Sequence, residues 1–384
     1  MPAPDQQFEH AVLPRATHDE RAREQIVRAL RRNVVGRLVP SVTDVWNTRV
    51  KDRFEEAPAS RHEIRAAMLE DPHIQHAFSL RRIVQEQTWD ATAEIVGRQI
   101  EELNERAQNV PARAGGTLEL DPSVEIPAYL KAMDIHAMPT GYWDEATDGY
   151  DVAAGAMYDR GVYLYASGMS GPLGDSRGRS IVENFWAAKL PEFKPKRILD
   201  LGCSVGHSLL PYAELYPDAE IWGIDVGPGV LRYGHARAES LGKKIHYRQM
   251  NAEHTSFPDG HFDLVTSHIL LHETSRPALR NIFAECHRLL APGGYMMHAE
   301  VPQYEGIDAF TQFMLDYDTY FNNEPFWGAM HDTDLRALAA EVGFETENVF
   351  IEFVASGRKE GSDRTGKTEK DKPAGQLQLT LARR

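Results

Sequence analysis

Cysteine, long hydrophobic runs and an apolar leader are all scarce or missing in this sequence. Cys203 and Cys286 are the only cysteines among 384 residues, which excludes a disulfide framework and favours a reducing compartment. No apolar run approaches the ~20 residues of a membrane span. The polar first ten residues lack the apolar core of a signal peptide. We therefore expect a cytoplasmic protein that contacts no membrane.

Positive charge is also in deficit. Lys and Arg total 42 against 57 Asp and Glu, so the formal net charge is −15. Such a surface repels phosphate backbones, which argues against nucleic acid as a partner. The chain length suggests two domains rather than one.

One glycine-rich turn organises the rest of the chain. Residues 198–201 form a short apolar run typical of a buried parallel strand. Gly202 and Gly206 then bracket a turn, and helical spacing resumes at Leu209. A strand, a glycine-rich turn and a helix make the first βα unit of a nucleotide-binding sheet.

The details of this turn separate two cofactor classes. A dinucleotide-binding fingerprint would place glycines at 202, 204 and 207, whereas this sequence has Ser204 and His207. Asp200 precedes the first glycine, and an acidic residue there suits a cationic ligand. A dinucleotide-dependent oxidoreductase therefore stays only as an alternative enzyme.

Further strands follow in a regular alternation with helices. The second strand, residues 220–225, ends in Asp225, ~20 residues beyond the turn, where an acid commonly binds ribose hydroxyls. The third strand ends at Asn251. The pattern then predicts strands at 262–267 and 295–301 and helices at 229–241 and 275–290.

Together these motifs resemble those of class I S-adenosylmethionine-dependent methyltransferases of the small-molecule type. The motifs are Asp-Leu-Gly-Cys-Ser-Val-Gly at 200–206, Phe-Asp-Leu-Val at 262–265 and Leu-Ala-Pro-Gly-Gly at 290–294. The resemblance covers about residues 160–384. It implies an α/β, Rossmann-like fold with seven mainly parallel strands and helices on both faces, the last two strands at 346–354 and 376–382. It also implies S-adenosylmethionine as cofactor, bound by Asp200, Gly202, Ser204, Gly206, Asp225, Val226, Asn251, Ala252 and His268.

The remaining sequence predicts an added N-terminal all-α domain. Ile26, Leu30, Val34 and Leu38 recur every fourth position, as on the buried face of an amphipathic helix. This helical region is a candidate substrate lid, a candidate homodimer interface, or both. We predict a disordered tail at 1–14, a helical domain at 15–110, a linker and active-site cover at 111–180, and a methyltransferase domain at 181–384 with a flexible loop at 356–375.

Two aromatic-rich stretches, residues 126–174 and 303–331, are candidate walls of an acceptor pocket, although core packing is an equal interpretation for many of their side chains. Aromatic walls exclude water and hold sulfonium cations. From these stretches and the fifth strand we select as substrate-binding candidates Tyr142, Tyr158, Tyr163, His298, Tyr317 and Trp327.

Titratable residues gather after the fourth and fifth strands. His272 is the candidate general base, and Glu273 either orients it or takes that role, as in similar small-molecule O-methyltransferases. The alternative is that His268 and His272 only bond the loop backbone. A metal site made by His268, His272, His298 and Glu300 was weighed, but histidines four apart share a face only on a helix. We therefore expect no metal.

The sequence thus predicts a methyltransferase that acts on a small-molecule acceptor, with oxygen favoured over sulfur or nitrogen. In-line methyl transfer requires alignment, exclusion of water and removal of any acceptor proton. The alternative from another class is a non-catalytic S-adenosylmethionine-binding protein whose helical region mediates assembly.

Overall fold

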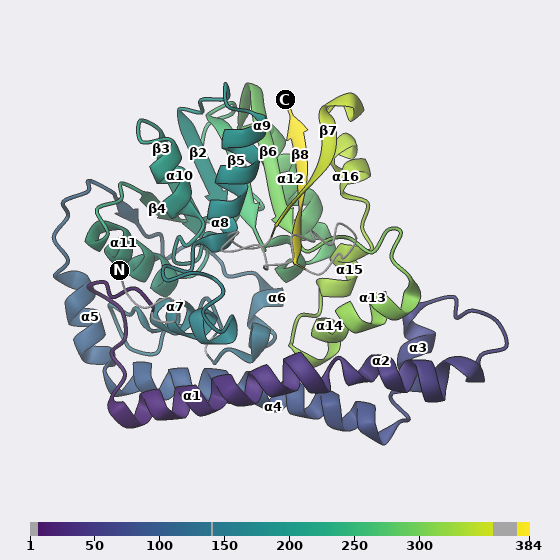
Figure 1. Ribbon diagram of the computed structural model, residues 1–384. Coiled ribbons are helices and arrows are strands. Elements are labelled where there is room, and N and C mark those ends of the chain that lie inside the picture. Colours follow the sequence, from purple (N-terminus) through teal and green to yellow (C-terminus); the bar gives the residue numbers. More distant parts are fainter. Residues whose placement is uncertain (1–6, 140, 356–374) are drawn as a thin grey trace.

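A mixed eight-stranded sheet forms the centre of the computed structural model, which describes residues 7–139, 141–355 and 375–384 (Figure 1). Its strand order is β1-β4-β3-β2-β5-β6-β8-β7, and β8 alone runs antiparallel to its neighbours. The strands are β1 (Leu118–Glu119), β2 (Arg197–Leu201), β3 (Glu220–Asp225), β4 (His246–Gln249), β5 (Phe262–His268), β6 (Leu290–Glu300), β7 (Val349–Ala355) and β8 (Gln376–Arg383).

The predicted Rossmann-like fold class is confirmed, with one strand more than expected. The extra strand is β1, which comes from the predicted linker and pairs in parallel with β4 through Leu118 and Tyr247. The five strands predicted from 197 to 301 are all present. Since the parallel strands end at one edge, the loops after β2, β3, β4 and β5 meet there.

Each sheet face is covered by helices, as expected for parallel strands buried on both sides. Adjacent residues of β2 show this, because Ile198 joins the core beneath one set of helices and Leu199 joins the opposite core. The first core contains residues of α8 (Ser176–Ile181), α10 (Leu209–Leu215) and α11 (Pro228–Ser240). The second contains residues of α12 (Arg276–Leu289) and α16 (Leu335–Glu341).

The N-terminal helices form an arm below the sheet, in which α1 and α4 run as a long pair (Figure 1). Thr17 caps α1 in a capping box with Glu20, and Asp71 caps α4 with Pro72 in its first turn. Ser60 caps α3 through the backbone N–H of Glu63. The arm helices are α1 (His18–Asn33), α2 (Ser41–Val45), α3 (Arg61–Met68), α4 (Pro72–Arg98) and α5 (Ile100–Gln108).

Helix α1 does not bury the apolar face that its sequence predicts. Ile26 is 68% exposed and Leu30 is 47% exposed. The buried face instead contains Glu20 and Glu24, whose carboxylates accept hydrogen bonds from Arg98 at 2.6 Å and from Arg160 at 2.7 Å. The guanidinium groups of the neighbouring helices pair with these carboxylates, so helix α1 buries its charged face instead of its apolar face.

The described part of the predicted N-terminal tail is packed rather than disordered. Val12 and Leu13 are buried, and the Phe8 N–H donates to the Pro172 carbonyl at 2.9 Å. The prediction of disorder is therefore wrong for residues 7–14. Residues 1–6 lie outside the described residues, as does the predicted flexible loop except for Gly375.

The arm and the sheet domain are packed together. Trp89 of α4 lies against Gly161 of α7 (Ala153–Tyr165) so closely that a Cβ there would approach its ring to 2.1 Å. Trp89, Val96 and Leu103 belong to the same core as the β2 residue Ile198. The arm is thus a wall of the sheet domain and not a free lid.

Short elements complete the cover between arm and sheet, with α13–α15 reaching from the sheet to the arm (Figure 1). Within the described ranges, every helix falls short of the length or hydropathy that a membrane span requires. These elements are α6 (Ala128–Lys131), α9 (Ala187–Lys189), α13 (Ala309–Leu315), α14 (Tyr317–Phe321), α15 (Trp327–His331), the 3-10 turns Lys51–Arg53, Ile135–Ala137, Leu271–Glu273 and Thr346–Asn348, and the π-helical turns Val34–Leu38, Trp46–Val50 and Val182–Trp186.

Candidate active site

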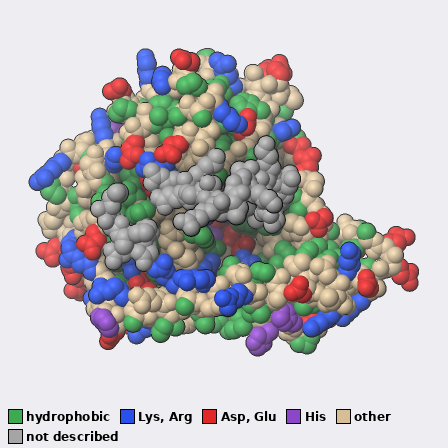
Figure 2. All heavy atoms as spheres, in the orientation of Figure 1, with side chains coloured by type: hydrophobic (Ala, Val, Ile, Leu, Met, Phe, Trp, Pro, Cys, Tyr) green, Lys and Arg blue, Asp and Glu red, His purple; other side chains and the backbone are tan. Residues whose placement is uncertain are grey.

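A cavity of about 330 Å³ lies where the carboxyl ends of β2, β3, β4 and β5 meet the arm. Its floor comes from the loops after these strands, and its walls come from residues 127–170, from α4 and from residues 318–327. In Figure 2 acidic atoms are visible inside a hollow between the sheet and the arm. Such a crevice at the strand ends is where open α/β sheets bind ligands.

The cofactor wall of this cavity is the glycine-rich turn with the end of β3. Ser204 has a left-handed backbone conformation, φ 47°, which explains why glycine is the easier residue there. Its N–H donates to Asp225 Oδ2 at 3.0 Å, and the Gly227 N–H donates to Asp225 Oδ1 at 2.9 Å. Because burial opposes its ionised form, the pKa of Asp225 is raised. The Ser204 hydroxyl is buried without a partner among the described residues, so it is free for a ligand.

Most of the predicted cofactor-binding residues line this cavity, but two do not. Asp200 is 2% exposed and lies behind the turn, and burial together with Asp225 raises its pKa well above the usual value. Gly206 is required for packing, since a Cβ there would lie 2.1 Å from the Tyr247 hydroxyl. The predicted residues in the lining are Gly202, Ser204, Asp225, Val226, Asn251, Ala252 and His268.

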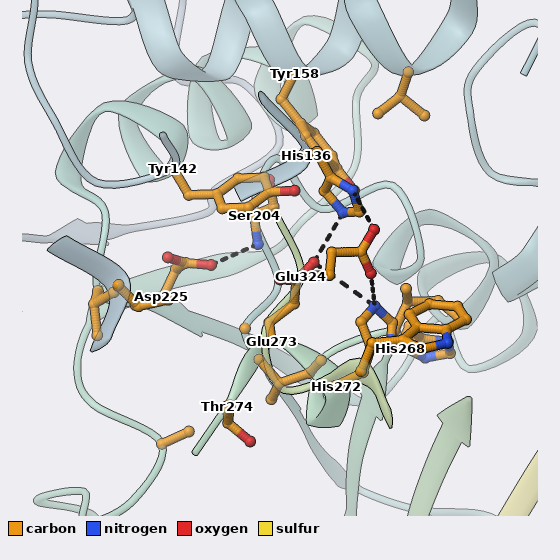
Figure 3. A pocket seen from close by; sticks show the side chains of 18 of the residues that line it. His136, Tyr142, Tyr158, Ser204, Asp225, His268, His272, Glu273, Thr274 and Glu324 are labelled. Carbon is orange, nitrogen blue, oxygen red and sulfur yellow. Dashed lines mark hydrogen bonds and ion pairs between the residues drawn. The ribbon is translucent and has the colours of Figure 1, made fainter. Parts of the chain in front are cut away.

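His272 stands on the opposite wall, in the 3-10 turn Leu271–Glu273 after β5 (Figure 3). Its Nδ1 pairs with Glu300 Oε2 at 2.6 Å, while Glu300 Oε1 accepts the N–H groups of Leu270 and Leu271. Burial lowers the pKa of His272, but the Glu300 carboxylate outweighs this effect and raises that pKa to about 9. Its Nε2 is buried and has no hydrogen-bond partner in the described part of the chain. Glu300, rather than Glu273 as we predicted, therefore orients the ring.

Glu273 instead pairs with a histidine from the cover. His136 Nε2 lies 2.8 Å from Glu273 Oε1, and His136 Nδ1 lies 2.8 Å from Glu324 Oε1 (Figure 3). Although burial lowers it, Glu324 and Glu273 hold the pKa of His136 well above its usual value. The His136 backbone has φ 57°, and its carbonyl accepts hydrogen bonds from Gln85 at 3.0 Å and Trp89 at 2.8 Å. The arm thus holds His136 in a conformation that non-glycine residues rarely adopt.

Insertion residues supply the other half of the same cluster, and the arm positions them as well. Arg81 of α4 pairs with Asp318 at 3.3 Å, and Arg61 of α3 pairs with Asp316 at 3.1 Å. Burial raises the pKa of Asp318 to about 6. Glu324 is 1% exposed, and its Oε2 has no hydrogen-bond partner among the described residues. The cavity therefore contains a buried polar cluster built by three separate stretches of chain.

Comparison with known proteins gives the family of this sheet domain. A family model for a methyltransferase domain matches residues 198–294. The chain is 34% identical over 140 residues to demethylmenaquinone methyltransferase of Thermus thermophilus, a match over 36% of this chain and 61% of that protein. It is 26% identical over 168 residues to ubiquinone biosynthesis O-methyltransferase of Pseudomonas aeruginosa, over 43% and 71% of the two chains.

The chain contains a class I S-adenosylmethionine-dependent methyltransferase domain. The chain spans less than two thirds of the first relative's length, so the match establishes the domain and its cofactor rather than the whole protein's reaction. Among solved structures, a putative O-methyltransferase from Nostoc punctiforme is 19% identical, with a TM-score of 0.39 over 58% of this chain and 60% of that one. The predicted methyltransferase class and the predicted cofactor are confirmed.

The acceptor side of the methyltransferase domain agrees less well with the predicted residues. Tyr142, Tyr158 and Trp327 line the cavity. Tyr317 lies in the arm core, where its hydroxyl donates to the Phe78 carbonyl at 3.2 Å. Tyr163 is buried on α7 and its ring faces Arg28, outside the cavity lining. Aromatic composition indicates a wall but does not tell which side of a helix faces it.

His298 was selected as a substrate contact, and this prediction is wrong. It points into the core behind β6, where its Nδ1 pairs with Ser267 Oγ at 2.7 Å and its ring stacks on Phe283 at 4.7 Å. Burial lowers the pKa of His298 to about 3, as expected for an imidazole kept neutral by the core. His298 shares a strand face with Glu300, but it lies two residues farther from the end of β6 and packs on Phe283 of α12 instead of reaching the cavity.

The sequence reasoning missed His136 and Glu324 as members of the site. Each is an ionisable residue within an aromatic-rich stretch, and ionisable side chains are rarely buried without a partner. That mismatch between an ionisable residue and apolar surroundings is the signal that would have pointed to them. Gln85 and Trp89 gave no comparable signal, since they look like ordinary residues of an amphipathic helix.

Proposed function

We propose that this protein transfers a methyl group from S-adenosylmethionine to an oxygen atom of a small-molecule acceptor. One observation carries the proposal: the cofactor wall at Ser204 and Asp225 and the polar cluster at His272 and Glu273 line a single cavity. The relative named as a ubiquinone biosynthesis O-methyltransferase supports oxygen as the accepting atom. The aromatic walls support an acceptor of low polarity.

The residues of the first wall fit the cofactor. Asp225 faces the cavity with a carboxylate that is already oriented by two backbone N–H groups, and its remaining lone pairs suit ribose hydroxyls. Asn251 and Ala252 line the same wall beyond β4, where the adenine ring would lie. The unpartnered Ser204 hydroxyl offers a further hydrogen bond. When bound, S-adenosylmethionine supplies an electrophilic methyl group on a sulfonium, and transfer leaves S-adenosylhomocysteine.

The second wall provides the proton acceptor that a hydroxyl acceptor needs. His272 and Glu273 line the cavity, and His272 Nε2 and Glu273 Oε2 have no hydrogen-bond partner among the described residues. Glu300 fixes the His272 ring by its Nδ1, so that Nε2 has one direction. We assign proton removal to this pair, with His272 as the base in its neutral form, which predominates above its pKa of about 9, and Glu273 as the carboxylate able to replace it. Tyr142 and Trp327 exclude water around them.

A turnover assay tests the proposal. The purified protein is incubated with S-adenosylmethionine and a panel of hydroxylated aromatic compounds. Release of S-adenosylhomocysteine together with a methyl-sized mass gain on one compound is expected. Binding of S-adenosylmethionine with no turnover on any phenolic, thiol or amine acceptor would favour the alternative of a non-catalytic binding protein.

The exposed apolar residues of the arm support a second copy of this chain as a partner. Ile26 and Leu30 of α1 and Ile83 of α4 are 68%, 47% and 45% exposed on helices that pack side by side. We propose that these residues form a homodimer interface. Light scattering of the wild type should give twice the mass of one chain. The double variant Ile26→Ser/Leu30→Ser should give the mass of a single chain. A monomeric wild type would contradict this interface.

A further inference from the structure

The polar cluster of the acceptor wall has more carboxylates than its histidines can pair. Glu273, Glu300 and Glu324 surround His136 and His272, and all five side chains are largely or wholly buried. Buried carboxylates are costly unless hydrogen-bonded or neutralised. Three carboxyl groups therefore face two imidazole rings beside a cavity that admits ligands.

Three ligand-type atoms in this cluster lack a hydrogen-bond partner within the described residues. They are His272 Nε2, Glu273 Oε2 and Glu324 Oε2, each on a side chain that lines the cavity. Buried polar atoms are rarely left unsatisfied, and a site that binds an ion is one reason for such atoms. These orphan atoms are independent of the excess of carboxyl groups, and both observations indicate that a cation belongs here.

The spacing of the atoms suits a single ion. His136, Glu273 and Glu324 each place one ligand atom within 4.8 Å of the others. His272 Nε2 lies 3.7 Å from Glu273 Oε1 and 3.8 Å from Glu324 Oε2 (Figure 3). Ligands bound at about 2.1 Å to a common ion lie roughly 3–4 Å from one another. The cluster is therefore compact enough to close on an ion with only side-chain adjustments.

The environment of His272 is that of a metal-bound histidine. Ligating histidines almost always donate their other ring N–H to a carboxylate or carbonyl, which orients the ring. Glu300 accepts from His272 Nδ1 at 2.6 Å and is itself fixed by two backbone N–H groups. Mixed imidazole and carboxylate ligands suit Zn²⁺, Fe²⁺ or Mn²⁺ better than Mg²⁺ or Ca²⁺, which prefer oxygen alone.

We infer that His136, Glu273 and Glu324, with His272, bind one divalent transition-metal ion at the acceptor wall. This set differs from the one weighed in the sequence, since His298 points into the core and Glu300 supports His272 from behind. Binding of the ion displaces the proton from the His136 nitrogen that becomes the ligand. Because the ion occupies His272 Nε2 and a Glu273 oxygen, the proton removal proposed above belongs to the ion-free protein, and the ion site itself does not require methyl transfer to occur.

Metal binding to the full-length protein tests the inference directly. Chelator-treated protein is titrated with ZnCl₂ or MnCl₂ by calorimetry, and bound metal is counted by mass spectrometry after dialysis. We expect one ion per chain. Co²⁺ in the same site should give visible absorption bands that are shifted and more intense than those of aqueous Co²⁺.

Matched variants separate this site from adventitious binding. Glu324→Gln should weaken binding at least 100-fold, and Glu300→Gln, behind His272, roughly 10–100-fold. Glu341→Gln removes the same charge from an exposed pair with Arg280 and should bind as the wild type does. If Glu324→Gln loses its fold by circular dichroism, His136→Gln replaces it. No stoichiometric ion in the wild type, or equal affinity in the folded site variant, would overturn the inference.

Discussion

Two buried clusters of histidine and carboxylate in this protein look alike in composition and differ in how fully they are bonded. In the first, Asp159 of α7 lies between His10 and His207, whose Nε2 atoms each approach it to 2.9 Å. Tyr233 donates to the same carboxylate at 2.8 Å and Gln7 donates at 3.1 Å. Both oxygens of Asp159 are thus satisfied.

In the second cluster, Glu273 and Glu324 each bond His136 through one oxygen and leave the other without a hydrogen-bond partner within the described chain. The first cluster ties the N-terminal segment to α7 and α11, whereas the second faces a cavity. A carboxylate bonded through both oxygens stabilises one structure, and a carboxylate bonded through one oxygen has capacity left for a ligand. Bonding of the carboxylate oxygens, more than residue type, distinguishes the structural cluster from the functional one.

The largest effect should come from the structural cluster. Asp159→Asn leaves the Arg237 guanidinium, which is 1% exposed, without its carboxylate. Breaking a buried ion pair on one side costs about 3–5 kcal/mol, and the free energy of unfolding should fall by that amount in urea titrations. Exposed Asp218→Asn is the control and should change it little. A loss below about 1 kcal/mol would show that the two clusters do not differ in this way.

The functional cluster should show the reverse pattern. His272→Gln keeps an amide N–H for Glu300 and should lower turnover ~100-fold or more, while S-adenosylmethionine affinity and melting temperature stay close to wild type. The control is His287→Ala, since that ring packs on Phe344 away from the cavity. Steady-state kinetics, calorimetry and thermal melts on one preparation measure all three quantities. Unchanged turnover on the identified acceptor would remove His272 from the reaction.

The fold was largely predictable from the sequence because it rests on short-range patterns. The apolar run before Gly202, the acid ending β3 and the Ala-Pro-Gly-Gly block each report on local backbone, and β2, β3 and β6 are present there, although β6 begins at Leu290 and so includes that block. The face of α1 was not predictable. Its buried side depends on Arg98 and Arg160, which lie far away in the sequence.

Only the wall of the site that follows the strands was predictable from the sequence. The cofactor wall consists of loops directly after strands, so position along the chain gave Ser204, Asp225 and Asn251. The acceptor wall combines residues 136, 272 and 324, which meet only because the arm holds both the cover and the insertion against the sheet. The spacing of these residues in the sequence does not indicate that they lie close together in the fold.

Asp225 tests whether hydrogen bonding of both oxygens is enough to mark a structural carboxylate. Backbone N–H groups bond both of its oxygens, yet the residue lines the cavity. If a position facing the cavity, rather than a free oxygen, makes a carboxylate functional, Asp225→Ala should weaken S-adenosylmethionine binding. The expected loss is about 1.5–3 kcal/mol, the contribution of hydrogen bonds to a charged group. Calorimetric titration measures it, with Asp218→Ala as the exposed control. Intact affinity with reduced stability would place Asp225 with Asp159 instead.

The smallest effect concerns pH and again belongs to the structural cluster. Burial lowers the pKa of His10 and His207 in the folded protein, against the attraction of Asp159, while Arg237 lowers it further. Although burial alone would raise it, Arg237 and the two histidines hold the pKa of Asp159 well below its usual value. The folded protein therefore binds fewer protons here than the unfolded chain once the pH drops below the histidine value of about 6.5.

The sign of the pH effect follows from this difference. Where the unfolded chain binds more protons, stability rises with pH, so the free energy of unfolding should fall as the pH drops from 7 to 5. One histidine contributes at most about 1.4 kcal/mol per pH unit, because one proton is gained. Urea titrations of His10→Gln at both pH values should show a shallower fall than wild type. The exposed His254→Gln should keep the wild-type slope, since its imidazole meets solvent in both states. Equal slopes in wild type and His10→Gln would mean that His10 takes up its proton without unfolding, and that the first cluster, like the second, still has capacity for a ligand.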